Sequence, residues 1–496
     1  MIITKFKINR NSNIIDSKNN LLNFINKFCN QSYFNTLAYM IGKKINIPKK
    51  YLINQTKIYL FLNYLNIEGR FKKKFSMVNL FKDFFFFLIK FNIIFFKSKK
   101  KFSTKKYELL IDDIDRDSHV NKFKNLSKLF NTIFFSTVDL RRGFNVFKFK
   151  NYEHCIRNKS VANSFKTIFI LALMSLKYSL KTKNNLFPIV DNFYKNYLIY
   201  ESLFLQIKAK YLLHERHYNC NEIRNYLFKK HGGICTAVTQ KNILQYNGPG
   251  MFIYADIIFT LGKKSAEDLE NMGGKVFKKI PVGSLAMEYS FFNIKKKIKN
   301  RVKKFDLIVF CSDNLAPFHS GYHEYYNNFY KHYEWIRKFA KKFPLISIGL
   351  KNKNVTKDKK VIEIFKGVSN VKFLFSNTLS KFSTNVLSDN YSNSYFYADK
   401  AKVLATWIST VGYEFFSQNK KTFFLDPGFR NTAFLRNKKY IKYYKIPSYA
   451  KFEKKIINEL NVKTKIVPKF KYNFCLKSNN VSKKIYSSLK KINLMP

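Results

Sequence analysis

Residues that mark turns, and cysteines that could be paired, are scarce in this chain of 496 residues. There are only 16 Gly and 10 Pro, so few boundaries between secondary-structure elements are marked. The six cysteines are scattered without a CxxC pair, which excludes a zinc ribbon and a disulfide scaffold and is typical of a reducing compartment. The first 30 residues lack the apolar core of a signal peptide. We therefore expect a cytoplasmic protein.

Long uninterrupted apolar runs are also missing. Residues 80–96 contain Lys82, Asp83 and Lys90 and fall short of the roughly 20 apolar residues of a membrane-spanning helix. We favour a buried helix for this stretch. The alternative is an interfacial helix with Phe on one face, peripheral on the inner face of the cell membrane, because the lysines at 97–101 would suit an anionic membrane surface.

Acidic residues are few compared with basic ones. The chain has 31 Asp and Glu against 91 Lys and Arg, which gives a net charge of +60. Only 12 of the basic residues are Arg, and the excess of Lys, Asn, Ile, Phe and Tyr is what an AT-rich genome produces. Phosphate contacts more often use Arg, and no clustered basic-aromatic motif such as an RNP sequence occurs. We therefore do not favour nucleic acid as a partner, and a basic RNA-binding or organellar ribosomal protein is the alternative of another class.

The length and a hydrophobic share of 46% predict a folded chain of two or more domains. Residues 1–104 are mostly helical in period and carry no motif, so we expect a helical extension of unknown role. Further helices are predicted over 119–130 and 160–230. The first compact strand begins at Tyr107 and ends in acidic residues. We expect a solvated turn there, the alternative being carboxylates at the lip of a sheet, and the residues are Asp112, Asp113 and Asp115.

Alternating strands and helices are predicted after residue 230. The run 231–248 holds a β-prone segment between Gly-rich turns, and a strand is predicted at 257–260. A short helix follows with Ser265 as its N-cap, and then a strand within 278–284. The basic run 292–304 is the expected crossing between two domains.

The second domain is predicted to begin with a strand at Phe305. The polar loop after it contains Asp313 and His319, which are side chains able to shuttle protons. A long amphipathic helix is expected over 325–342, and a further strand is expected over 344–350.

Residues 395–428 predict one compact strand-turn-helix-strand unit. A short helix or turn precedes a strand at 403–408, the turn is formed by small residues at 409–412, and a helix is predicted to begin at Tyr413. A second strand is expected at 422–425.

The turn at 409–412 is a candidate phosphate site, because a helix N-terminus offers unpaired N–H groups and the positive end of the helix dipole. Glu414 could accept hydrogen bonds from a sugar hydroxyl. Lys351 and Lys353 come just past a strand and would face the same crevice. The alternative is an ordinary helix start with surface lysines nearby, since Ser and Thr cap helices and Glu is favoured in first turns.

Two segments resemble GT-B glycosyltransferases that build bacterial surface and capsular polysaccharides. Their donor-site unit is similar to residues 397–426, YADKAKVLATWISTVGYEFFSQNKKTFFLD, in its order of aspartate, strand, Ser-Thr-x-Gly-x-Glu turn and strand. The end of their N-terminal domain is similar to residues 245–284, with Asp256 and the closing Gly283-Ser284. Tyr246 stands where that pattern carries His.

The resemblance implies an α/β fold of two Rossmann-like, doubly wound domains that face a cleft. The acceptor domain would cover 105–290 and the nucleotide-sugar donor domain 305–440. The C-terminal segment 441–496 is expected to be helical, and its stretch LKSNNVSKKIYSSLKKI would cross back onto the first domain, as the last helix does in many GT-B enzymes.

The implied reaction is transfer of a sugar from a nucleotide-activated donor to a growing surface polysaccharide or a lipid-linked acceptor, with no cofactor and no metal site. A polyol-phosphate transferase of the teichoic-acid type shares the fold and is the alternative within enzymes. The candidates for the catalytic base are His231, Asp313 and His319. The candidates for donor binding are Lys351, Lys353, Asp399, Ser409, Thr410, Gly412 and Glu414.

Overall fold

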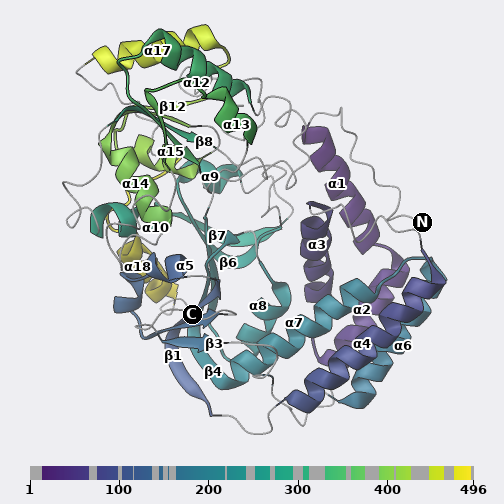
Figure 1. Ribbon diagram of the computed structural model, residues 1–496. Helices are drawn as coiled ribbons and strands as arrows, with labels where there is room; N and C mark the ends of the chain where they lie inside the picture. Colours follow the sequence, from purple (N-terminus) through teal and green to yellow (C-terminus); the bar gives the residue numbers. More distant parts are fainter. Residues whose placement is uncertain are drawn as a thin grey trace.

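The computed structural model describes residues 14–65, 75–98, 103–115, 117–136, 145–148, 155, 164–217, 220–241, 252–268, 274–293, 305–311, 330–352, 359–374, 390–406, 409–425, 446–462 and 474–492. Within these residues the chain forms two parallel β-sheets, one of 7 strands and one of 5. The sheets lie in separate lobes with helices packed on both of their faces (Figure 1). The predicted α/β fold of two doubly wound domains is confirmed.

The first sheet has the strand order β3-β2-β1-β4-β5-β6-β7, and every pairing in it is parallel. Its strands are β1 (Lys105–Ile114), β2 (Thr132–Ser136), β3 (Val146–Lys148), β4 (Ile207–His214), β5 (Cys235–Thr239), β6 (Tyr254–Thr260) and β7 (Lys275–Pro281). All residues of β2 and β5 are buried, as expected for parallel strands covered on both faces.

One face of the first sheet shares a single hydrophobic core with the N-terminal helices. These helices are α1 (Ile14–Cys29), α2 (Ser32–Ile45), α3 (Lys49–Leu65) and α4 (Met77–Lys97), and they pack with α6 (Phe165–Thr182), α7 (Phe187–Gln206) and α8 (Glu222–Lys230). Side-chain caps fix where several of them begin. Ser164 accepts from the N–H of Thr167 at the start of α6, and Asn221 accepts from the N–H of Arg224 at the start of α8.

The other face of the first sheet is covered by α5 (Asp117–Asn121), the short helix η1 (Leu126–Lys128) and α18 (Val481–Ile492). Val481, Ile485 and Leu489 of α18 are fully buried against this sheet. The predicted return of the C-terminal helix onto the first domain is therefore confirmed.

The second sheet has the strand order β10-β9-β8-β11-β12 and is also parallel throughout. Its strands are β8 (Phe305–Cys311), β9 (Ile348–Asn352), β10 (Val371–Leu374), β11 (Ala401–Thr406) and β12 (Thr422–Phe424). One face packs on α12 (Lys331–Lys342), α13 (Lys359–Ile364) and α17 (Tyr449–Asn461). The other packs on α14 (Asn390–Lys400), α15 (Thr410–Ser417) and α10 (Leu285–Met287). Because α10 directly follows the end of the first domain, it joins the two lobes.

The largest error in the sequence prediction concerns β4. We expected helix throughout 160–230, but β4 begins at Ile207, immediately after α7 ends at Gln206. No Gly or Pro separates the two elements, so the sequence gives no boundary signal. The missed strand lies at the centre of the first sheet.

Smaller differences concern where two helices begin and where one strand ends. The helix predicted from Tyr413 begins at Thr410, so most of the expected turn is helical. Ser265 lies inside α9 (Lys263–Asp268) and is not its N-cap; its buried hydroxyl accepts from the amide of Gln240 at 3.1 Å. Lys351 is part of β9, which extends to Asn352.

The apolar stretch at 80–96 forms α4, and only one of its faces is buried. Leu80, Phe87, Phe91 and Ile94 face the core, with the ring of Phe91 centred 4.8 Å from that of Tyr194. The opposite face is exposed. The interpretation of residues 80–96 as a buried helix is therefore correct for one face of α4 and wrong for the opposite face. Among the residues that the structure describes, no helix combines the length and apolarity needed to cross a bilayer.

Candidate active site

Polar residues gather at the carboxyl edge of the first sheet. Because all of its strands run parallel, their carboxyl ends meet along one edge, which is where doubly wound folds bind ligands. Asp112 and Asp113 lie in the last three residues of β1, and β4 ends at His214, followed by Glu215, Arg216 and His217. Four of these side chains, those of Asp112, His214, Glu215 and His217, are almost completely buried.

Asp112 is buried next to Arg224 and His214 and is not in a solvated turn as expected from the sequence. The guanidinium of Arg224 lies 3.0 Å from its carboxylate, and His214 lies 3.6 Å away. Burial alone would raise the pKa of Asp112, but the hydrogen bond to His214 and the charge of Arg224 lower it to about 2. Asp113 and Asp115 both bind the guanidinium of Arg216. The alternative of carboxylates at the lip of a sheet is therefore the correct one.

Glu215 is the centre of a second group of charges. Its carboxylate pairs with the ammonium of Lys122, lies 3.5 Å from that of Lys241 and lies 3.1 Å from the Nε of Arg216. Burial would raise the pKa of Glu215, but the charges of Lys122 and Lys241 lower it to about 2. The side chain is therefore an anion at neutral pH, and it holds both lysines at the sheet edge.

Two buried histidines complete this group. His119 Nε2 lies 2.8 Å from the ammonium of Lys241, and its Nδ1 lies 2.7 Å from a carboxylate oxygen of Asp115. Since an ammonium only donates, Nε2 accepts and Nδ1 carries the proton. Burial lowers the pKa of His119. Burial also lowers the pKa of His217 to about 3, and its Nδ1 accepts from the backbone N–H of Lys241 at 3.2 Å. Both rings are therefore neutral and fix the position of Lys241.

The strand end at β7 contributes a turn that reaches the second domain. Gly283 has φ = +102°, and a side chain there would meet the Ser478 hydroxyl at 2.9 Å, so glycine is required on both counts. The hydroxyl of Ser284 accepts from the N–H of Met287 and begins α10. The same hydroxyl also hydrogen-bonds to Glu414 of α15.

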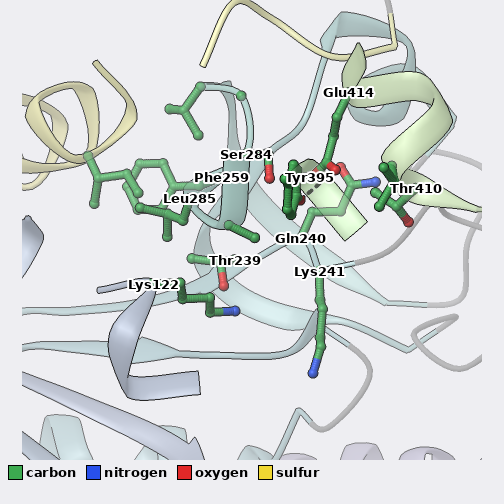
Figure 2. Close-up of a pocket in the computed structure, with 15 residues that line it drawn as sticks. Lys122, Thr239, Gln240, Lys241, Phe259, Ser284, Leu285, Tyr395, Thr410 and Glu414 are labelled. Carbon is green, nitrogen blue, oxygen red and sulfur yellow. Dashed lines mark hydrogen bonds between the residues drawn. The ribbon is translucent and has the colours of Figure 1, made fainter. Parts of the chain in front are cut away.

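Glu414 is buried at 2% exposure, although we expected it to be accessible to a sugar hydroxyl. The phenol of Tyr395 donates to its carboxylate at 2.6 Å, next to Ser284 (Figure 2). Burial raises the pKa of Glu414 above its usual value, and the hydrogen bonds from Ser284 and Tyr395 reduce that shift without cancelling it. Glu414 therefore connects the two domains.

Ser409 and Thr410 form the start of α15. Ser409 occupies the N-cap position, where its side chain makes no capping bond and its N–H donates to the Thr406 hydroxyl. A Cβ on Gly412 would lie 2.4 Å from the Thr406 methyl group. Close packing of α15 on the end of β11 therefore accounts for this glycine.

A cavity of about 70 Å³ lies where these elements meet. The first domain lines it with Lys122, Lys241 and the end of β5, and the second lines it with Thr410, Val411 and Glu414. Figure 2 shows these two groups on opposite sides of the cavity. The carboxyl edge of the first sheet therefore faces the N-terminus of α15 directly.

The other predicted site residues that the structure describes do not line this cavity. His231 lies between α8 and β5, at the amino edge of the first sheet, where its Nε2 is 2.9 Å from a carboxylate oxygen of Glu201. Lys351 is buried at the end of β9. The main-chain carbonyl of Asp399 accepts from Lys420 at 2.8 Å. The remaining three candidates lie outside the described residues, and they are Asp313, His319 and Lys353.

Sequence reasoning missed Lys122, Lys241 and the residues 214–217. The available signal was an apolar run at 211–213 followed by His-Glu-Arg-His, which is a strand ending in ionisable residues. The lysines gave no signal, because the chain has 79 of them among its 91 basic residues. Within the described part of the chain, no group of three or more His, Cys, Asp or Glu side chains is placed to hold a metal ion.

Comparison with known proteins gives similarity only at the level of structures. No protein-family model matches the chain, and no curated protein matches it in sequence. Similar solved structures include the wall teichoic acid polymerase TagF, with 11% identity, 85% of this chain and 100% of that chain covered, and a TM-score of 0.40. A glycosyltransferase from Rickettsia africae ESF-5 has 11% identity, coverage of 78% and 99%, and a TM-score of 0.41. MurG from Acinetobacter baumannii has 7% identity, coverage of 77% and 99%, and a TM-score of 0.34.

Proposed function

We propose that the chain is a glycosyltransferase that moves a sugar from a nucleotide-activated donor to a glycan or a lipid-linked acceptor. The observation that carries the proposal is the cavity between the two domains. The N-terminus of α15, a helix of the second domain, faces Lys122 and Lys241 at the carboxyl edge of the first domain's sheet. Donor and acceptor held by different domains could react across such a cavity, as the GT-B arrangement requires.

The donor's phosphates would bind at the start of α15. The first N–H groups of a helix have no acceptor within it, and the helix dipole adds a partial positive charge there. Thr410 adds a hydroxyl at this position and lines the cavity. Lys122 and Lys241, on the facing edge, would stabilise the charge that develops on the departing phosphate. The base that takes the acceptor's proton stays a prediction, with Asp313 and His319 as its candidates.

The size of the cavity requires that the domains move. A volume of about 70 Å³ accommodates roughly two water molecules at about 30 Å³ each, whereas ligand pockets are typically about 300–1,000 Å³. A nucleotide-activated sugar would therefore enter only when the contact between Glu414 and Ser284 opens. Closure of the domains onto a bound donor would then exclude water from the reacting groups.

The experiment is a thermal-shift screen of the full chain against UDP-, GDP-, CMP- and CDP-activated sugars and a CDP-activated polyol. We expect one nucleotide class to raise the Tm. Lys241→Gln should weaken the binding of that donor by about tenfold or more, because it removes a charge-assisted contact of about 1.5–3 kcal/mol. Lys241→Arg should retain most of the affinity.

The matched control is Lys275→Gln, because Lys275 is an exposed lysine of the same domain, on β7. Both variants lose one positive charge, so a loss of affinity confined to Lys241→Gln would locate the donor at the cavity. Equal losses in the two variants would show attraction by the overall charge alone. A shift produced by a CDP-activated polyol, and by no activated sugar, would replace the glycosyltransferase proposal with a polyol-phosphate transferase.

A further inference from the structure

Exposed apolar side chains are concentrated on two neighbouring helices of the first domain. Among the residues that the structure describes, 12 of the 18 large hydrophobic side chains with high exposure belong to α4 or α6. Single exposed hydrophobic residues are ordinary, but a contiguous group of this size is not. We call this surface the α4–α6 face and define it by Val78, Phe85, Ile89 and Phe96 of α4 and Phe165, Phe169, Leu173 and Leu180 of α6.

The spacing on α4 explains why these side chains share one face. Val78, Phe85, Ile89 and Phe96 follow one another at intervals of seven, four and seven residues, which places them in one stripe along the helix. Phe85 and Phe96 are 58% and 67% exposed. The buried stripe on the opposite side packs on α7, where the ring of Phe87 is centred 5.9 Å from that of Phe187. α4 is therefore apolar on both sides, while the residues that the structure describes cover only one of them.

α6 has the same construction. Phe165, Phe169, Leu173 and Leu180 are each at least 41% exposed and recur at four- or seven-residue intervals. The opposite side of α6 is buried in the core of the first domain. Apart from the contact of Phe165 with α4, the described chain leaves this apolar stripe exposed.

The two stripes form one continuous surface because the helices run antiparallel side by side (Figure 1). At one end, the ring of Phe165 is centred 4.4 Å from that of Phe95 and 5.1 Å from that of Phe96. At the other end, Asn185, just beyond α6, donates to Asp83 near the start of α4. A helix of 21 residues spans about 30 Å at 1.5 Å per residue, so the face extends over about that length.

The charges around the face are almost all positive. Its exposed lysines are Lys82, Lys97, Lys166, Lys177 and Lys181. The sole acidic residue on the two helices is Asp83, and it accepts from Asn185. A second copy of this chain would place lysines against lysines. An anionic bilayer instead offers acyl chains for the stripes and negative headgroups for the lysines.

We propose that the α4–α6 face docks flat on an anionic lipid bilayer. The apolar stripes would enter the boundary between headgroups and acyl chains, and the lysines would lie among the headgroups. The buried side of α4 fixes this orientation, because deeper insertion would pull Phe87 and Phe91 out of the core. The α4–α6 face shares no residue with the cavity, so the docking proposal does not depend on which reaction takes place at the cavity.

The apolar contribution is tested by vesicle flotation of the full chain. We expect it to float with vesicles of phosphatidylcholine and phosphatidylglycerol in equal amounts, and much less with phosphatidylcholine alone. Phe85→Gln with Phe96→Gln should reduce the bound fraction by about tenfold or more, since burying one aromatic side chain is typically worth about tenfold in an equilibrium. The control is Phe277→Gln with Leu345→Gln, which removes two side chains that are 73% and 97% exposed elsewhere.

The charge contribution needs its own control, because the net charge of +60 alone attracts the chain to anionic vesicles. Replacing Lys82, Lys166 and Lys177 by Gln should weaken flotation by about tenfold or more, since each lysine near an anionic surface is worth about fivefold. The control removes three exposed lysines of the second domain, Lys341, Lys366 and Lys372.

Equal losses in the two lysine variants would overturn the proposal, because attraction would then come from the whole molecule. Flotation that is unchanged by the aromatic substitutions would overturn it as well. If the chain instead forms dimers that Phe85→Gln with Phe96→Gln abolishes, the face is an interface between copies and the bilayer is not its occupant.

Discussion

Glu215 and Glu414 are two buried glutamates on opposite sides of one cavity, with exposures of 0% and 2%. Glu215 contacts the cations of Lys122 and Arg216, and the charges of its neighbours overcome the effect of burial and lower its pKa to about 2. Glu414 is hydrogen-bonded to the hydroxyls of Tyr395 and Ser284, and burial raises its pKa. Burial acts against the charged form on both sides, and the partners decide whether the pKa falls, as for Glu215, or rises, as for Glu414.

The comparison assigns different physical roles to the two sides of the cavity. The first domain presents fixed charges that are already paired, so little rearrangement would be needed to stabilise charge on a ligand. The second domain presents a helix start whose position depends on close packing, at Gly412 against Thr406. We therefore expect substitutions on the first side to act through electrostatics and those on the second side to act through shape.

The largest effect should come from Glu215→Gln. The substitution keeps the size of the side chain but leaves Lys122 and Arg216 without their buried anion. Removal of one partner from a buried ion pair typically costs about 3–5 kcal/mol. Urea denaturation should therefore show a large drop in the free energy of unfolding.

The control for Glu215→Gln is Glu453→Gln, which removes a partly exposed carboxylate paired with the exposed Lys342. Exposed pairs contribute little to stability, so this variant should be close to wild type. The pH dependence gives a second check. Because the folded pKa of Glu215 is below its unfolded value, its stabilising contribution is present above about pH 4.5 and is lost as the pH falls toward 2. A wild-type chain no less stable at low pH would contradict the assignment.

A smaller effect is expected from Gly412→Ala on the second side. The new Cβ would lie 2.4 Å from the Thr406 methyl group, so the helix must shift or the strand must give way. Overpacking of this kind costs about 1–3 kcal/mol. Thermal or urea unfolding measures the loss.

The combination of Gly412→Ala with Thr406→Ser separates packing from a role in binding. Thr406→Ser removes the obstructing methyl group and keeps the hydroxyl that accepts from the N–H of Ser409. If steric conflict is the cause, the double variant should regain much of the stability lost in Gly412→Ala. A double variant no more stable than Gly412→Ala would show that the conflict with Thr406 does not explain the glycine.

The second sheet was the more predictable part of the fold. Its strands at Phe305 and 422–425 are short apolar runs next to polar turns. These turns mark where one element ends and the next begins. β4 was not predictable, because α7 passes into it without an intervening residue. The local sequence allows helix through Ile207, and pairing with β1 and β5 makes it a strand.

The candidate site divides in the same way. Thr410 and Glu414 were found from a local pattern, the helix start after a strand, and both line the cavity. Lys122, Glu215 and Lys241 come from three separate segments and meet only because parallel strands share an edge. Once β4 was taken for helix, no local signal could place Glu215 there.

The smallest effect should come from Glu414→Gln, which is the direct counterpart of Glu215→Gln. A glutamine keeps an oxygen that can accept from Tyr395 and Ser284, and no buried cation loses a bonded partner. We expect a change of about 1 kcal/mol or less in the free energy of unfolding at neutral pH. The pH dependence should be opposite to that of Glu215. Because the folded pKa of Glu414 is raised, the wild-type carboxyl stabilises the fold at low pH, and this contribution is lost as the pH rises from about 4.5 through the folded pKa. The stability of wild type relative to Glu414→Gln should therefore fall over that range and then level off. If Glu414→Gln destabilised the chain as strongly as Glu215→Gln, and more so at higher pH, both glutamates would be held as anions and the two sides of the cavity would not differ.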